Sequence, residues 1–136
     1  MGQWVASSWN NADEYVASGT PFLTCSANAE LTNATAIQVK FPRVTKWIRV
    51  ENLDATPGNI MYFGVSKNGV LSNPTANRWM VAGTQSSFFV DWKCTSIWVI
   101  AGTGNAIQFQ VSAGLTNVPD GSMFALTGSA GVGGVG

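Results

Sequence analysis

Short alternations of apolar and polar residues, each ended by turn-forming residues, recur along this chain from about residue 20 to residue 112. The clearest occupy residues 37–41 (IQVKF) and 107–111 (IQFQV), where every second side chain is apolar. A period of two places these apolar side chains on one face of a β-strand. Because such a face must be buried against a second layer, the pattern predicts packed sheets.

Turn signals divide the chain into about eight such runs, at a spacing typical of sandwiches and barrels. We expect strands near residues 22–25, 37–41, 44–52, 60–65, 78–82, 87–92, 95–100 and 107–111. The pair Asn68-Gly69 predicts a hairpin turn, since it is the strongest short hairpin signal. After Leu115 the strand pattern ends, and no run shows the 3.6-residue period of a long helix.

The sequence therefore predicts an all-β fold, an antiparallel β-sandwich of the jelly-roll type over residues 21–125. Residues 1–20 show no clear period and are expected to form an N-terminal arm. Residues 126–136 are rich in glycine and carry no charge, so they are expected to form a flexible tail. Both ends are expected to become ordered through contacts with other subunits.

The phase of the alternation predicts which side chains face the core. In residues 44–52, Ile48 and Val50 are expected to face inward, while Thr45 and Trp47 face the other way. The predicted core side chains are Ile48, Val50, Phe63, Ile107, Phe109 and Val111. We also expect Trp47, Trp92 and Trp98 to pack in the core, and Cys25 and Cys94 to be small buried apolar residues.

Charge is scarce and balanced. Seven basic and seven acidic side chains make up 10% of the 136 residues, against about 25% in a typical soluble domain. A neutral, charge-poor surface favours association, although a neutral monomer with a Ser/Thr/Asn-rich surface is the alternative. Without a basic excess, nucleic-acid binding is not expected. Residues 97–101, the longest apolar run, are far fewer than the about 20 that a membrane span needs.

Histidine is absent, which removes the usual general base and the commonest metal ligand. Two cysteines without histidine do not form a zinc site. The residues Gly131, Gly133 and Gly136 match a dinucleotide-binding spacing, but no strand and helix flank them. We therefore expect no enzyme, cofactor or metal. A pair of acids acting as a hydrolase is the alternative, drawn from Asp13, Glu14, Glu30, Glu51, Asp54, Asp91 and Asp120.

Some apolar residues lie where the strand pattern is weak, and these are candidates for an interface. They are Trp4, Trp9, Trp79, Gly131, Val132 and Val135. Exposed tryptophans can also stack on sugar rings, so a lectin-like role is a further alternative.

Four segments resemble, in the same order, segments of small virion structural proteins of tailed bacteriophages, including cyanophages and other aquatic phages. They are VTKWIRVEN at residues 44–52, FGVSKNGV at 63–70, FQVSAGLTNV at 109–118 and LTGS at 126–129, followed by a Gly-Val-Gly run. The resemblance covers about half of the predicted domain. It implies a capsid decoration, or cement, protein with a β-sandwich fold, set on the outside of an icosahedral head.

This resemblance sets the expected partners and place of the protein. The partner would be the major capsid protein, and a homotrimer would match the three-fold positions of the lattice. The protein would be made in the cytoplasm of the bacterial host, since the first residues do not look like a signal peptide, and would end on the capsid surface of the virion. A receptor- or glycan-binding module of a tail fibre or spike is the alternative function.

Overall fold

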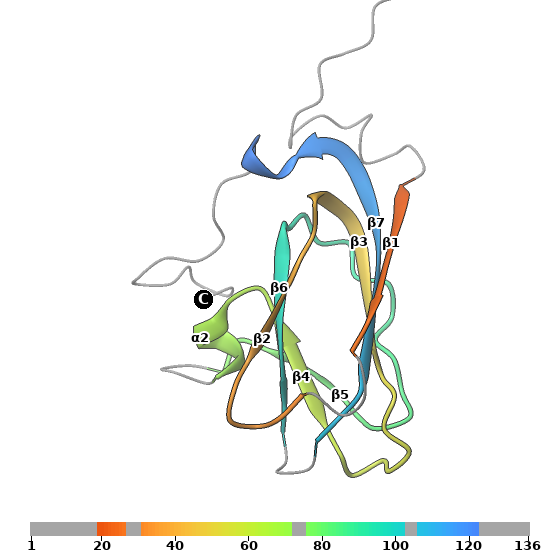
Figure 1. Cartoon of the computed structure of the whole chain (residues 1–136), viewed down its shortest axis with the longest axis vertical. Coiled ribbons are helices and arrows are strands. Elements are labelled where there is room, and N and C mark those ends of the chain that lie inside the picture. Colours follow the sequence, from red (N-terminus) through yellow and green to blue (C-terminus); the bar gives the residue numbers. More distant parts are fainter. Residues whose placement is uncertain (1–18, 27–30, 72–75, 103–105, 123–136) are drawn as a thin grey trace, which may run out of the picture.

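The computed structural model describes residues 19–26, 31–71, 76–102 and 106–122, which form two antiparallel sheets packed face to face (Figure 1). The three-stranded sheet has the order β1 (Thr20–Cys25), β7 (Phe109–Pro119), β3 (Arg43–Asn52). The four-stranded sheet has the order β2 (Ile37–Lys40), β6 (Ser96–Ala101), β4 (Met61–Gly64), β5 (Trp79–Val81). The prediction of an antiparallel β-sandwich is confirmed.

The core lies between the two sheets, and the alternation in the sequence placed it correctly. All six side chains predicted for the core are at most 4% exposed. They come from β3, β4 and β7 and from the residues just before β7, so both sheets contribute. Outward-facing positions of β3 and β7, such as Arg49 and Ser112, are only partly buried, as expected for a sheet with one solvated face.

The prediction that Thr45 faces away from the core is wrong, because the side chain is 0% exposed. The register of β3 against β7 shifts on both sides of this residue, between Arg43 and Thr45 and again between Thr45 and Trp47. Such a bulge breaks the period of two and turns a side chain to the other face. The hydroxyl is tolerated inside because it is hydrogen-bonded to Cys94 and Trp92.

The predicted hairpin turn at Asn68-Gly69 is also wrong, although β4 and β5 on either side of it form an antiparallel pair. These residues lie in the one-turn helix α2 (Lys67–Val70), which follows β4. Ser66 caps this helix, since its Oγ accepts a hydrogen bond from the Gly69 backbone N–H at 2.9 Å. A two-residue Asn-Gly turn needs a second strand directly after it, whereas here the next strand, β5, begins only at Trp79.

The strand pattern continues beyond Leu115, contrary to the prediction. Strand β7 extends to Pro119 and is followed by a short 3-10 helix, η1 (Asp120–Ser122). Residues 113–116 are all buried, so both faces of the strand are covered and the alternation disappears. The buried hydroxyl of Thr116 is satisfied, since its Oγ donates to the Val44 carbonyl oxygen at 2.8 Å. Most of the expected arm and the whole expected tail lie outside the described residues.

Candidate functional site: an exposed aromatic edge

Residues 85–94 run along the free edge of β3, where the sequence predicts a regular strand over 87–92. The structure instead has isolated bridges, Ser86 to Glu51 and Val90 to Ile48. Ile48 and Val90 exchange backbone hydrogen bonds of 2.9 and 2.8 Å. The segment therefore covers the edge of the three-stranded sheet without forming a continuous ladder, and its side chains need not alternate.

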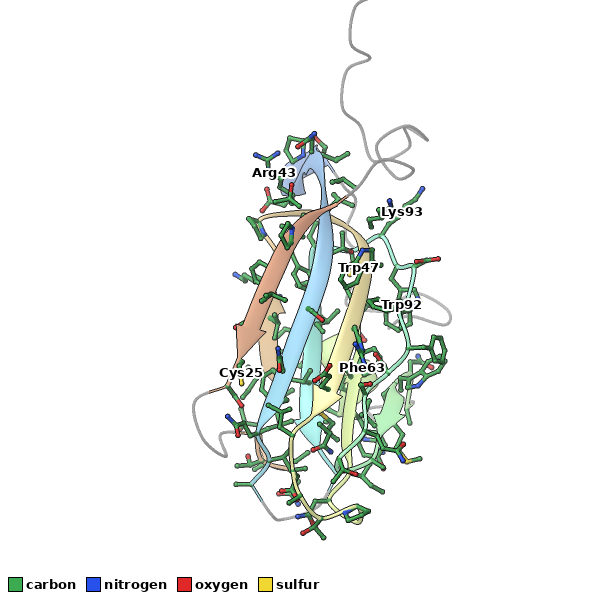
Figure 2. All side chains as sticks on the ribbon, turned by 90° about the vertical axis from the view of Figure 1, so that its right-hand side faces the viewer. Cys25, Arg43, Trp47, Phe63, Trp92 and Lys93 are labelled. Carbon is green, nitrogen blue, oxygen red and sulfur yellow. The ribbon has the colours of Figure 1, made fainter. Side chains whose placement is uncertain are left out.

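Thr45 fixes the far end of this segment. Its hydroxyl donates to the Trp92 carbonyl oxygen at 2.7 Å and accepts from the Cys94 backbone N–H at 3.1 Å. The Thr45 backbone N–H also donates to the Cys94 carbonyl oxygen at 3.0 Å. Because Thr45 and Cys94 are fully buried, these bonds form without competition from water, and they hold Trp92 next to β3 (Figure 2).

Five aromatic side chains from β3, β5 and the 85–94 segment form two groups of ring contacts, which meet along the chain at the neighbouring residues Phe88 and Phe89. We call this set the aromatic edge, and it comprises Trp47, Trp79, Phe88, Phe89 and Trp92. Trp79 and Phe88 contact edge to face with their ring centroids 5.2 Å apart, and Trp47 and Phe89 do the same at 4.9 Å. Both geometries are favourable for aromatic pairs.

The core residue Phe63 supports the aromatic edge from inside. Its ring centroid lies 6.5 Å from that of Trp79 and 5.8 Å from that of Trp92. Phe63 itself is 0% exposed. Trp79 and Trp92 therefore connect this part of the aromatic edge to the core.

Three members of the aromatic edge remain open to solvent: Trp79 at 41%, Phe88 at 63% and Phe89 at 58%. The neighbouring Met80 is 56% exposed. Single exposed apolar residues are ordinary, but adjacent exposed aromatic side chains are typical of a surface that binds a partner.

Arg49 adds a positive charge to this surface. Its guanidinium carbon lies 5.4 Å from the centre of the Phe89 ring, which is cation–π distance. Nη2 donates to the Ser86 hydroxyl at 2.9 Å, and Nη1 lies 3.7 Å from the Glu51 carboxylate. These contacts fix the guanidinium beside the exposed ring.

A polar depression of about 410 Å³ adjoins the aromatic edge at Arg49. Its lining is Arg49, Glu51, Asn52, Leu53, Asp54, Ala55, Thr84, Gln85 and Ser86. Thr84 has a positive φ of 68°, which shapes the turn on one side. On the other side, Asp54 Oδ1 accepts hydrogen bonds from the Thr56 backbone N–H at 2.8 Å and from Asn59 Nδ2 at 3.0 Å. Asp54 thus helps to hold its own loop.

Of the predicted interface residues, Trp79 is exposed on β5 and belongs to the aromatic edge. Trp4, Trp9, Gly131, Val132 and Val135 lie outside the described residues.

The sequence reasoning missed Phe88 and Phe89. Adjacent residues of a strand face opposite sides, so a Phe-Phe pair already indicates that one ring points away from the core.

The expectation that Trp47, Trp92 and Trp98 lie in the core is met only in part. All three are half-buried. Trp92 packs against the main core, and Trp98 packs against a small separate cluster of Ala36, Val70 and Ile100. Trp47 lies across Gly114, where an added Cβ would collide with the indole ring. Trp47 and Trp98 lie on the side of their strands opposite the buried Ile48 and Ile97, as the alternation of a strand requires.

The two cysteines differ, contrary to the expectation that both are buried. Cys94 is 0% exposed, and burial raises its pKa to about 11, although the hydrogen bond with Thr45 works in the opposite direction. Cys25 is exposed at the end of β1. It faces outward because β1 alternates and its partly buried positions are Phe22 and Thr24.

Within the described ranges, no group of three or more Cys, Asp or Glu side chains could hold a metal ion. No helix among the same residues is long and apolar enough to cross a membrane.

No protein-family profile matches the chain, and no curated protein matches it. One solved structure, described as "Bacillus endospore appendages form a novel family of disulfide-linked pili", aligns with 85% of this chain and 100% of its own. The sequences are 14% identical over this alignment, and the TM-score is 0.39. At such a score the likeness carries no statement about the fold or function of this chain.

Proposed function

We propose that this protein is a capsid decoration protein, which binds the outer surface of an assembled bacteriophage head and stabilises it. The observation that carries the binding role is the exposed aromatic edge, in which Trp79, Phe88 and Phe89 are open to solvent and Trp79 packs against the core residue Phe63. The four phage-like segments of the sequence direct the proposal to a phage head.

The aromatic edge has the composition of a binding hot spot, in which a few aromatic and arginine side chains carry most of the energy. Fully burying a large apolar side chain contributes about 1.5–3 kcal/mol. Phe88 and Phe89 are each more than half exposed, so each has about 1–2 kcal/mol left to gain. Since 1.4 kcal/mol is tenfold in affinity, the pair would change binding by about 30-fold or more.

We also propose that the sandwich is a jelly roll. If residues 85–94 are counted as a sixth strand, the two sheets read 1-8-3-6 and 2-7-4-5 along the chain. That is the winding of two Greek keys in a jelly roll, a fold used by viral capsid proteins and by lectins. The topology supports both candidate functions and does not choose between them.

The stabilisation of the capsid follows from thermodynamic linkage between binding and assembly. A protein that binds joints of the assembled lattice better than free capsid subunits makes the shell harder to dissociate. A homotrimer at three-fold positions would present three aromatic edges at once. Binding through several sites raises the effective concentration of each remaining contact, so modest single contacts suffice.

The test uses capsids stripped of this protein. Wild-type protein should rebind and raise the temperature at which the capsids come apart. A Phe88→Ser/Phe89→Ser variant should lose binding by about 30-fold or more while its own melting temperature stays close to wild type, since both rings are mainly exposed. Leu23→Ser is the matched control, because Leu23 is 69% exposed on β1, away from the aromatic edge. Equal capsid stabilisation by the double variant and the control would refute the proposal.

The polar depression next to Phe89 favours a second candidate, a receptor- or glycan-binding module of a tail fibre or spike. An exposed ring beside carboxylate, amide and guanidinium groups is a combination that binds sugars by stacking and hydrogen bonding. A glycan array separates the two functions. Binding that is lost on Gln85→Ala, with no binding to stripped capsids, would favour the glycan module.

A further inference from the structure

The balanced charge of the chain hides an uneven distribution within the sandwich. The described ranges hold all seven basic residues and four of the seven acidic ones, so their net charge is +3. Four of these basic residues lie on β3 or in the 85–94 segment, and the four acids lie on β3, just after it, in the 85–94 segment or in η1. These eight charges cancel. The whole excess therefore comes from the three remaining basic residues, which are Lys40, Lys67 and Arg78.

These three cations belong to the four-stranded sheet and its helix. Lys40 ends β2, Lys67 begins α2, and Arg78 directly precedes β5. Helix α2 lies on the side of this sheet that faces away from the three-stranded sheet (Figure 1). Among the described residues, the segments that build this layer contain no acidic side chain; they are residues 31–42, 60–71, 76–82 and 95–102. We call the outer surface of this layer, with its three cations, the basic face.

The side chains of the basic face point away from the core between the sheets. On β2, Val39 is buried in that core, so the adjacent Lys40 faces outward and is exposed. Val70 of α2 belongs to a separate apolar cluster, against which Tyr62 of β4 and Trp98 of β6 pack. Strands β2, β6 and β4 and helix α2 therefore share one outer surface.

Aromatic rings hold two of these cations without neutralising them. The Arg78 guanidinium carbon lies 3.8 Å from the centre of the Tyr62 ring, and Nη1 donates to the Val70 carbonyl oxygen at 2.9 Å. Lys67 Nζ lies 5.7 Å from the centre of the Trp98 ring. Both are cation–π contacts, in which the partner ring has no net charge. The positive charge of each side chain therefore remains available to a partner.

Within the described ranges, no carboxylate pairs with Lys40, Lys67 or Arg78. Arg49 on the other sheet differs, since it lies 3.7 Å from the Glu51 carboxylate. Because the rings already restrict the side chains of Lys67 and Arg78, these two lose less conformational freedom when a partner binds. More of their attraction then appears as affinity.

The composition of the basic face fits a protein partner. Met80 lies opposite Tyr62 on the neighbouring strand and is 56% exposed, while Tyr62 and Trp98 are half-buried. Tyrosine, tryptophan, methionine and arginine are enriched at protein interfaces. A small-molecule site would be concave, whereas this surface is the outer face of a sheet. Duplex DNA carries one charge per about 1.7 Å, so three separated cations match it poorly.

We propose that the basic face binds an acidic surface of another protein. The cations project from β2 or lie over β6 and β4, which are neighbouring strands, so the acidic groups of the partner spread over about 10 Å. A second copy of this chain does not match, because the eight charges of its described residues outside the basic face cancel.

The basic face is separate from the aromatic edge, so both surfaces can be occupied at once. On a phage head the acidic surface belongs to a second capsid subunit beside the one that holds the aromatic edge. The decoration protein then bridges two subunits of the lattice. This assignment of the partner rests on the proposed function, whereas the binding of an acidic protein surface does not.

An acidic peptide tests the basic face without any capsid. Labelled decaglutamate should bind the full-length protein at about 50 mM NaCl and lose affinity as added salt screens the charges. Lys40→Gln/Lys67→Gln should bind roughly 2- to 30-fold more weakly, since each exposed ion pair contributes up to about fivefold in affinity. The matched control is Arg43→Gln/Lys93→Gln, which removes the same charge from exposed positions outside the basic face and should bind like wild type.

Four results would overturn the inference. They are a wild-type chain that does not bind the peptide, an equal loss in the test variant and the control, and tighter binding of a DNA duplex than of the peptide at the same salt concentration. The fourth is binding that appears only after Asp13→Asn/Glu14→Gln/Glu30→Gln, which would assign the basic face to acidic residues of the chain itself. All four replaced basic side chains are exposed, and a thermal melt confirms that each variant folds.

Stripped capsids separate this inference from the proposed function. If both hold, Lys40→Gln/Lys67→Gln weakens capsid binding and reduces its dependence on salt, whereas Phe88→Ser/Phe89→Ser weakens it and leaves the salt dependence. A chain that binds the peptide but not the capsids refutes the decoration role alone. Capsid binding that ignores both salt and the lysine replacements refutes the bridging contact and leaves the decoration role intact.

Discussion

Replacing Thr45 with valine keeps the shape of the side chain and removes one hydroxyl from the interior. Thr45 is 0% exposed, and its Oγ accepts a hydrogen bond from the Cys94 backbone N–H at 3.1 Å. In the variant this N–H is left buried without an acceptor. Such an unsatisfied donor costs about 1–3 kcal/mol. The hydroxyl also donates to the Trp92 carbonyl oxygen at 2.7 Å, and that bond contributes about 0.5–1.5 kcal/mol.

The additional methyl group of valine offsets about 0.8 kcal/mol of this loss. The net destabilisation is therefore about 2 kcal/mol. For a domain of this size that lowers Tm by roughly 6–10 °C.

The assay is urea denaturation followed by tryptophan fluorescence, with Thr45→Ser as the matched control. Serine keeps the hydroxyl and loses one buried methyl group, which costs about 1 kcal/mol. The hydrogen-bond argument ranks the stabilities as wild type, then serine, then valine. If burial of apolar area alone decided stability, valine would be the most stable. A valine variant as stable as wild type would refute the role given to this hydroxyl.

Four further predictions concern the cysteines, Phe109 and Gly114. A thiol reagent at pH 8 should modify Cys25 at once and Cys94 only on unfolding. The pKa of Cys94 is about 11 in the folded protein and near 9.0 in the unfolded chain. The buried thiol therefore contributes to stability fully below pH 9, and this contribution is lost as the pH rises through 11. Urea melts at about pH 8 and about pH 10.5 would check the loss. Phe109→Ala should cost roughly 3–5 kcal/mol, and a loss below about 1 kcal/mol would contradict its place in the core. Gly114→Ala should displace the Trp47 indole and destabilise by about 1–3 kcal/mol, with an altered fluorescence spectrum that a Trp47→Phe background abolishes.

The sequence by itself determined the sheets and the phase of the core. A period of two appears wherever one face of a strand is buried and the other is solvated, as in residues 107–111, and there the prediction is right. The same signal vanishes in residues 113–116, where both faces of β7 are covered. The sequence pattern therefore predicts an end of this strand that is too early. The absence of histidine and the shortage of charge likewise constrain function without any structure.

Only the tertiary structure decided where the alternation breaks and which aromatic side chains remain outside. The bulge that turns Thr45 inward depends on the register of β3 against β7, which no local pattern encodes. Asn68-Gly69 forms a helix turn because Ser66 caps it and because β5, the strand that pairs with β4, begins only at Trp79. The aromatic edge joins side chains from β3, β5 and the 85–94 segment, up to 45 residues apart in the chain. The rings meet because the 85–94 segment pairs with β3 of one sheet while its Phe88 contacts Trp79 on β5 of the other sheet, an arrangement that no local pattern encodes.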